Sequence, residues 1–100
     1  MEDDFQKVQV FASKKHNLAI IRALLKTPHG IGFNSLLKMI EPITPRILST
    51  RLSELEKLGV IQKNLVLGSK PKIEYRALGK AEGLKKAISE LEKWGAKALK

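Results

Sequence analysis

The chain has 100 residues, with 19 lysine and arginine residues against 10 aspartate and glutamate residues, and no cysteine. This length predicts a single domain over residues 1–100, and the missing thiols exclude disulfides, cysteine-based metal sites and thiol catalysis. No apolar run approaches the roughly 20 residues that span a bilayer. The acidic start at Met1–Asp4 is unlike a signal peptide, so we expect a cytoplasmic protein.

The net charge of +9 indicates a polyanionic partner. The excess is densest in residues 60–80, where one acid, Glu74, stands against Lys63, Lys70, Lys72, Arg76 and Lys80. Charge that served solubility alone would be spread more evenly. We therefore expect double-stranded DNA as the partner and no membrane.

Two helices are predicted at the start of the chain. Phe5, Val8 and Phe11 recur at helical spacing and predict a helix over about residues 4–12. Residues 16–26 predict a denser apolar helix, most of whose surface must be buried. Proline and glycine in Thr27–Gly30 end it.

A short extended piece at Ile31–Phe33 leads into a third helix. Asn34 is the predicted N-terminal cap of this helix, which covers residues 35–40 and stops at Glu41-Pro42. The backbone N–H groups at its Ser35 end are suited to holding a phosphate, although this geometry is not specific.

The fourth predicted helix has the strongest start signal of the chain. Thr44 provides a hydroxyl cap, Pro45 takes the first helical position, and Gly59 ends the helix. Its inner face carries Leu48, Leu52 and Leu55. Because about three residues separate it from the third helix, the pair forms a helix-turn-helix pattern.

A hairpin and a last helix complete the predicted order. Residues 60–67 are strand-like, residues 67–71 form a turn, and the returning strand alternates through Ile73, Tyr75 and Ala77. Residues 79–99 predict a helix with a stripe formed by Leu84, Ile88 and Leu91, beside Trp94. The fold class is therefore mainly α with a small β-hairpin, a winged helix-turn-helix: helix, helix, strand, helix, recognition helix, hairpin wing, C-terminal helix.

The outer face of the fourth helix is the candidate for reading DNA. A step of 100° per residue places its polar side chains opposite the leucines; with the cap, the set is Thr44, Arg46, Ser49, Thr50, Ser53 and Lys57. Small hydroxyls allow the backbone to approach DNA closely, and an arginine can bind guanine with two hydrogen bonds. The alternative is a solvated face without function, which the basic hairpin behind the helix disfavours.

The candidate phosphate contacts lie mainly on the hairpin. Lys70 and Lys72 flank the predicted tip and would bind the DNA backbone, or would instead protect an edge strand from pairing. Arg76 and Lys63 are weaker candidates. Arg51 lies at the edge of the buried face, where it would either reach a phosphate or pair with an acid.

No chemistry beyond binding is legible in the sequence. His16 and His29 are 13 positions apart and make a poor metal site. We find no glycine-rich phosphate loop, no clustered carboxylates and no nucleophile beside a base. We therefore expect no catalytic residues, no metal, no cofactor and no enzymatic activity.

The run from Ile43 to Ile61 resembles the recognition helix of HxlR-type winged-helix transcription regulators, which belong to the MarR-like superfamily. The resemblance continues at Phe33-Asn34-x-Leu36 and at Ile73-Glu74-Tyr75, and it covers about residues 15–84. It implies a dimeric, prokaryotic-type regulator with its recognition helix at Thr44–Leu58 and its wing at about Gly68–Lys72.

The resemblance also implies that the terminal helices, residues 4–12 and 79–99, form the dimer interface. The interface candidates are the apolar residues Phe5, Val8, Phe11, Leu84, Ile88, Leu91 and Trp94. The chain departs from the family pattern in having no N-terminal cysteine, so a thiol switch is excluded. It also lacks the aromatic residue often found where His16 stands, and it carries Ala77–Ala81 in place of the usual pattern after the wing tyrosine.

Three functions remain open from the sequence. The first is a homodimeric transcription regulator that reads a pseudo-palindromic DNA site. The second is an architectural protein that binds DNA without regard to sequence, which suits the net charge of +9. The third is a winged helix that binds another protein through its terminal helices. A ratio of specific to nonspecific DNA affinity separates the first two.

Overall fold

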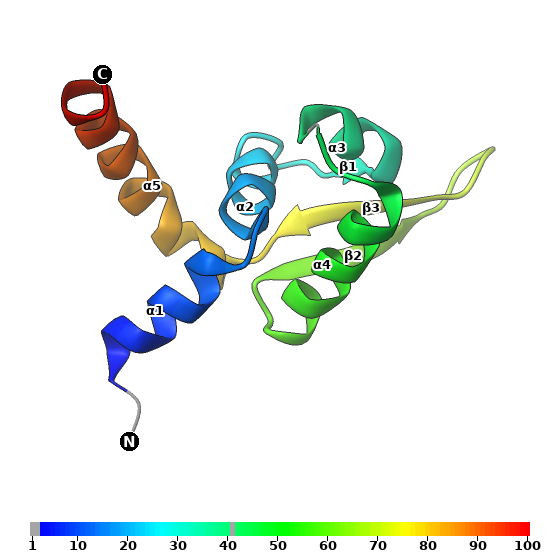
Figure 1. Cartoon of the computed structure of the whole chain (residues 1–100). Coiled ribbons are helices and arrows are strands. Elements are labelled where there is room, and N and C mark those ends of the chain that lie inside the picture. Colours follow the sequence, from blue (N-terminus) through cyan, green and yellow to red (C-terminus); the bar gives the residue numbers. More distant parts are fainter. Residues whose placement is uncertain (1–2, 41) are drawn as a thin grey trace.

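The computed structural model describes residues 3–40 and 42–100; the predicted features at Met1-Glu2 and at Glu41 lie outside them. Within these residues, five helices surround a small antiparallel sheet, as Figure 1 shows. The predicted winged helix-turn-helix fold is confirmed. The elements are α1 (Asp4–Ser13), α2 (Asn17–Leu25), β1 (Ile31–Gly32), α3 (Phe33–Met39), α4 (Pro45–Lys57), β2 (Ile61–Val66), β3 (Lys72–Ala77) and α5 (Gly79–Ala98).

A sharp corner separates α1 from α2. His16 takes a left-handed backbone conformation with φ of +80°, which a helix cannot contain, so α2 begins at Asn17 and not at the predicted residue 16. The side chain of Asn17 then donates from Nδ2 to the carbonyl oxygen of Phe11 at 3.1 Å. This hydrogen bond holds the end of α1 against the start of α2.

The predicted cap at Asn34 is wrong. Helix α3 begins two residues earlier than predicted, at Phe33, and its N-cap is Gly32, without a side-chain hydrogen bond. The cause is tertiary: Ile31 and Gly32 pair with Tyr75 and Glu74 of β3, so strand geometry persists to Gly32 and the helix starts directly after it. Pairing between distant strands overrides the local preference of Asn34 for a cap position.

The predicted start and end of α4 are confirmed. Thr44 Oγ1 accepts a hydrogen bond from the N–H of Ile47 at 3.1 Å, and Pro45 is the first helical residue. At the other end, Gly59 follows the helix with φ of +77°, a conformation that favours glycine. The recognition helix is therefore delimited by its own sequence.

Thr44→Ala tests the cap. The variant should lower the free energy of unfolding by about 1 kcal/mol, because one N–H group at the start of α4 loses its partner. Thermal or urea unfolding measures the change. Thr44→Ser is the matched control, since it keeps the hydroxyl and should restore most of the loss; equal losses in the two variants would contradict a capping role.

The three strands are arranged in the order β1-β3-β2, and both pairs are antiparallel. The central strand, β3, therefore joins the segment before α3 to the hairpin that follows α4. Register pairs Ile61 with Ala77 near the core and Val66 with Lys72 near the tip. The hairpin reaches beyond the helices and forms the wing (Figure 1).

The core lies between the sheet and the helices α2 to α4, with the first part of α5 closing it. All three leucines predicted to face inward from α4 are buried. The largest fully buried side chains are Ile20, Ile21, Leu24, Leu36, Leu48, Leu52, Leu55 and Ile61. This core fixes the orientation of α4, and the polar residues opposite its leucines consequently face outward.

The molecule is more extended than its length predicts. Its radius of gyration is 14.5 Å, whereas a compact domain of this length has about 13 Å. Its accessible surface is 7385 Å², whereas a monomer of this mass exposes about 5,700 Å². Helices α1 and α5 account for the difference in shape, because they project at the end of the molecule opposite the wing tip (Figure 1).

Candidate nucleic-acid interface

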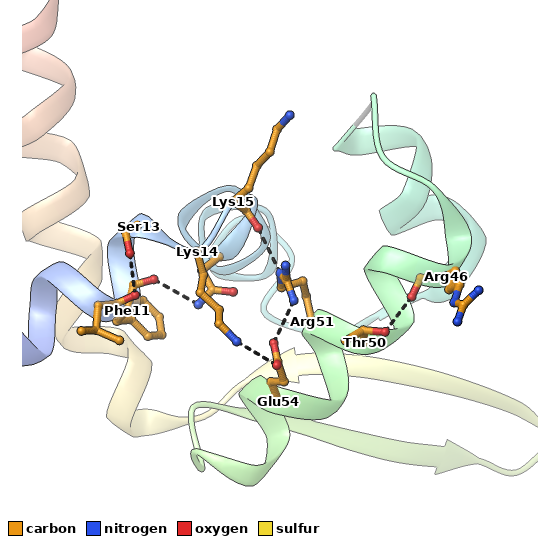
Figure 2. A network of polar contacts seen from close by, with 10 residues as sticks. Phe11, Ser13, Lys14, Lys15, Arg46, Thr50, Arg51 and Glu54 are labelled. Atoms are coloured by element: carbon orange, nitrogen blue, oxygen red, sulfur yellow. Dashed lines mark hydrogen bonds and ion pairs between the residues drawn. The ribbon is translucent and has the colours of Figure 1, made fainter.

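The outward face of α4 carries the predicted DNA-reading side chains. Those of Arg46, Ser49, Thr50, Ser53 and Lys57 are all exposed, as is the cap residue Thr44. Arg46 stands in the first turn and is directed away from the corner between α1 and α2 (Figure 2). The face is accessible over the full length of the helix, so it is open to a DNA groove.

Two hydroxyls of this set already take part in hydrogen bonds. Thr50 Oγ1 donates to the carbonyl oxygen of Arg46 at 3.0 Å, and Thr44 Oγ1 accepts from the backbone at the helix start. The Thr50 hydroxyl therefore presents lone pairs outward, and its hydrogen is used within the helix. Ser49 and Ser53 extend the small-residue surface that lets a backbone approach closely.

Arg51 pairs with an acid, which was one of its two predicted roles. Its Nη1 contacts Glu54 Oε1 at 3.1 Å, and its Nε donates to the carbonyl oxygen of Lys15 at 3.2 Å. Glu54 Oε2 also contacts Lys14 Nζ at 2.9 Å. Figure 2 shows this corner anchor, formed by Lys14, Lys15, Arg51 and Glu54, which ties α4 to the corner between α1 and α2.

The corner anchor leads us to expect that the stability of the folded protein depends on pH. The hydrogen bond from Lys14 and the positive charge of Lys14, and after them the hydrogen bond from Arg51, hold the pKa of Glu54 below its usual range. A carboxyl whose pKa is lowered by folding stabilises the folded state above its unfolded pKa and loses that effect as the pH falls through the folded value. The contribution of Glu54 should therefore disappear in acid.

Titration of the Glu54 side-chain carboxyl by carbon NMR measures this effect. Lys14→Gln should move its midpoint upward, because the first partner is lost. The internal control is Glu92, whose pKa is lowered by Arg22 and not by Lys14; its midpoint should not move. If Lys14→Gln left the Glu54 midpoint in place, the ion pair would not exist in solution.

The predicted wing residues occupy different places on the hairpin. Lys70 is exposed in the turn at the tip, while Lys72 Nζ contacts Glu74 at 3.2 Å, which offsets part of its charge. Lys63 and Arg76 are exposed on opposite faces, because Lys63 pairs with Tyr75 and Arg76 with Gln62. Lys70 is thus the best placed of the four for a phosphate.

Lys15 lies at the candidate site, which its position in the sequence did not predict. The start of α4 and the corner before α2 together form a cavity of about 520 Å³, which is lined by Lys15, His16, Pro42, Ile43, Thr44, Ile47 and Arg51. In Figure 2 the ammonium of Lys15 extends away from Glu54. This places a further positive charge beside the recognition helix, and nothing in the sequence spacing links residue 15 to residue 44.

The predicted dimer residues fall into two groups. Ile88 is buried, and Phe11 and Leu84 pack against the core of the same chain. In contrast, Phe5 is 72% exposed and Trp94 is 59% exposed, and Val8 and Leu91 are exposed as well. The second group is available to a partner, while the first group supports the two helices on their own domain.

Metal sites and membrane-spanning helices are absent from the part of the chain that the structure describes. Residues 3–40 and 42–100 contain no cluster of side chains that could hold a metal ion. No helix among them is both long and apolar enough to cross a membrane.

Comparison with known proteins places this geometry in a family. The model of the HxlR-like helix-turn-helix family matches residues 11–100. The chain belongs to this family. The HxlR-like match is wider than the resemblance read from the recognition helix, since it includes the whole of α5. Membership in this family confirms the prediction that the protein is a helix-turn-helix regulator and not an enzyme.

Two relatives have names that match a helix-turn-helix regulator. HTH-type transcriptional regulator BH0655 of Halalkalibacterium halodurans is 36% identical over 78 residues, which are 78% of this chain and 69% of that protein. HTH-type transcriptional regulator YvaP of Bacillus subtilis is 29% identical over 90 residues, 90% of this chain and 82% of YvaP.

Two solved structures show the same fold. The HTH-type transcriptional regulator ytcD matches with a TM-score of 0.85 at 24% identity, covering 98% of each chain. The reduced form of the transcriptional regulator YodB from Bacillus subtilis matches with a TM-score of 0.83 at 21% identity, covering 98% of this chain and 95% of YodB. These likenesses extend over α1 and α5 as well as the winged helix.

Proposed function

We propose that this HxlR-like protein is a transcription regulator of the cytoplasm that binds a specific, pseudo-palindromic DNA site as a homodimer. The observation that carries the proposal is the exposed polar face of α4, with Arg46 at its start, on a helix-turn-helix of this family. Side chains on such a face reach base edges in the major groove.

The charge distribution supports DNA as the partner. Lys15 precedes the recognition helix in the sequence and lies beside its start in the structure. Lys70 follows the helix in the sequence and is exposed at the wing tip. Each adds a positive charge to the winged helix. Contacts to phosphates position a protein on the duplex, and contacts to bases select the sequence. In this proposal Arg46, Ser49, Thr50 and Ser53 select, while Lys15, Lys70 and Lys72 position.

The extended shape supports a dimer. The accessible surface of the chain exceeds that expected of a compact monomer by about 1,700 Å². A standard interface buries about 800 Å² of accessible surface on each partner. The exposed apolar side chains of α1 and α5 are the surface to be covered. Binding of the dimer to successive major grooves requires a two-fold axis at these helices that sets the two recognition helices about 34–36 Å apart.

Fluorescence anisotropy tests the proposal. The probes are a duplex from the upstream region of the protein's own gene and a scrambled duplex of the same length, each titrated over a range of salt concentrations. A preference of about 10³ or more establishes a regulator that reads sequence. Equal affinities with a steep salt dependence would favour the architectural function, and no binding at low salt would favour a protein partner.

Lys70→Ala tests the positioning role of the wing. The variant should weaken binding to both duplexes alike, and the slope of log affinity against log salt should fall in magnitude by about one, because one fewer counterion is released. Lys97→Ala on the last turn of α5 is the matched control and should leave the slope as it is. An unchanged slope in Lys70→Ala would remove this lysine from the phosphate contacts.

A further inference from the structure

The wing carries exposed apolar side chains that lie outside both the core and the proposed dimer interface. Leu67 is 77% exposed and Leu65 is 61% exposed, and Val66 and Ile73 are exposed as well. All four lie on the hairpin, whereas α1 and α5 lie at the opposite end of the molecule (Figure 1). We call these four residues the apolar tip. Single exposed apolar side chains need no explanation, but a group of them on one element marks an interaction surface.

The apolar tip has side chains on both faces of the hairpin. Leu65 pairs with Ile73, so these two share one face. Val66 pairs with Lys72 and takes the other face, and Leu67 follows directly after the strand. A surface that docks on one flat partner needs only one apolar face. A projecting ribbon that is apolar on both faces instead fits a slot with a wall on either side.

Positive charge is present on both faces of the hairpin as well. Lys63 shares the face of Leu65, while Arg76 shares that of Val66, and both cationic side chains are exposed. Lys70 in the turn adds a further charge at the end of the hairpin. The matching slot therefore has anionic walls on both sides and a floor without charge. The minor groove of DNA, with a phosphate backbone along each side and base edges at its floor, has this character.

We propose that the apolar tip is a wedge that enters the minor groove beside each half-site, separates the bases of one step and bends the duplex. This inference rests on the proposed function, in which α4 occupies the adjacent major groove. A sheet with its side chains is about 10 Å thick, whereas the minor groove of B-DNA is about 6 Å wide, so the groove must open. Inserted leucine and isoleucine side chains unstack base steps and bend the duplex toward the major groove.

The wedge adds a sequence preference outside the base pairs that α4 reads. Pyrimidine–purine steps such as TA unstack readily, whereas A-tracts are stiff and have a narrow minor groove. A TA step at the position of the wing therefore costs less to open than an A-tract at the same position. The preference arises from the cost of deforming DNA and requires no hydrogen bond between the wing and a base.

Energy transfer between dyes at the two ends of the preferred duplex measures the bend with the full chain. The parent protein should shorten the distance between the ends. Leu67→Ala should leave the duplex nearly straight and weaken binding about tenfold, the equivalent of one leucine side chain left in water. Its salt dependence should stay the same, because no charge is removed. Leu58→Ala is the matched control, since it truncates an exposed leucine at the end of α4, outside the wing; it should keep both bend and affinity.

Leu67→Lys separates a wedge from simple attraction to phosphates. The variant adds a positive charge at the same place, so the slope of log affinity against log salt should rise in magnitude by about one if a phosphate is near. The strongly hydrated ammonium group is unsuited to a place between bases. We therefore expect the bend to be lost in spite of the added charge. A bend that persisted in Leu67→Lys would overturn the wedge.

The flanks of the preferred duplex are tested by moving a TA step or an A-tract along them. We expect the parent protein to favour TA about fivefold or more at one position on each side, the lower end of the effect of one base pair, and Leu67→Ala to lose this preference. Equal affinities at every position, or an unchanged bend in Leu67→Ala, would overturn the wedge and leave the proposed function standing. Equal binding of the preferred and scrambled duplexes would overturn the proposed function, while the bend in either duplex still decides the wedge; no binding at low salt would overturn both.

Discussion

Replacing Trp94 with aspartate should halve the mass of the protein in solution. The side chain is more than half exposed on α5, on a molecule whose surface exceeds that of a compact monomer. A charge at the centre of an apolar interface is left without a partner on association, and such charges are costly. Analytical ultracentrifugation should give 11.2 kDa for the variant and twice that for the parent protein.

The loss of the dimer should also reduce DNA affinity. Two linked recognition helices bind a palindromic site with an avidity that exceeds a single contact by about 10²–10⁴, and we expect Trp94→Asp to weaken binding by about 10²-fold or more. The effect arises although Trp94 lies on a terminal helix, far along the chain from the recognition helix.

Ser89→Asp is the matched control for Trp94→Asp. It adds the same charge to the same helix, and a separation of five residues places it on a different face of α5. It should keep both the dimer mass and the DNA affinity. A Trp94→Asp protein that retained the double mass would place the dimer interface elsewhere, and a loss of helical circular dichroism would instead indicate damage to the fold.

Replacing Arg46 with alanine should relax the choice of base at one position of each half-site. A guanidinium that forms two hydrogen bonds to guanine contributes about 1–3 kcal/mol of discrimination. We therefore expect the preferred duplex to lose affinity by about that amount and the scrambled duplex to lose little. Anisotropy with duplexes that vary one base pair at a time identifies the position.

Arg46→Lys separates reading from simple attraction. Lysine keeps the positive charge but lacks the planar fork of two donors. If Arg46 reads a base, the lysine variant should behave like the alanine variant on the preferred duplex. Equal losses on preferred and scrambled DNA in Arg46→Ala, with recovery in Arg46→Lys, would make this residue a phosphate contact.

Local signals predicted the parts of the fold that local chemistry determines. Thr44, Pro45 and Gly59 delimit α4 by capping and backbone preference, and the structure has the same limits. Asn34 shows where this approach ends, because the start of α3 depends on the pairing of Ile31–Gly32 with a strand some forty residues later. Such pairing leaves no trace in the spacing of neighbouring residues.

In the candidate site, too, the features set by local chemistry were predictable and those set by long-range packing were not. Helical periodicity correctly separated the exposed face of Arg46 and Ser49 from the buried leucines, because that separation depends on one helix alone. The position of Lys15 beside α4 depends on how α1 turns into α2 at His16. A left-handed residue other than glycine gives the sequence no strong signal.

The corner anchor has a consequence for how such a protein can change over evolution. Glu54 fastens α4 to the segment that leads from α1 into α2, whereas Arg46 stands in the first turn of α4, directed away from the anchor (Figure 2). The residue that anchors α4 is thus distinct from the residue that we propose reads a base. For the dimer proposed above, we expect substitutions at the anchor to alter the accepted half-site spacing and to leave the preferred bases the same.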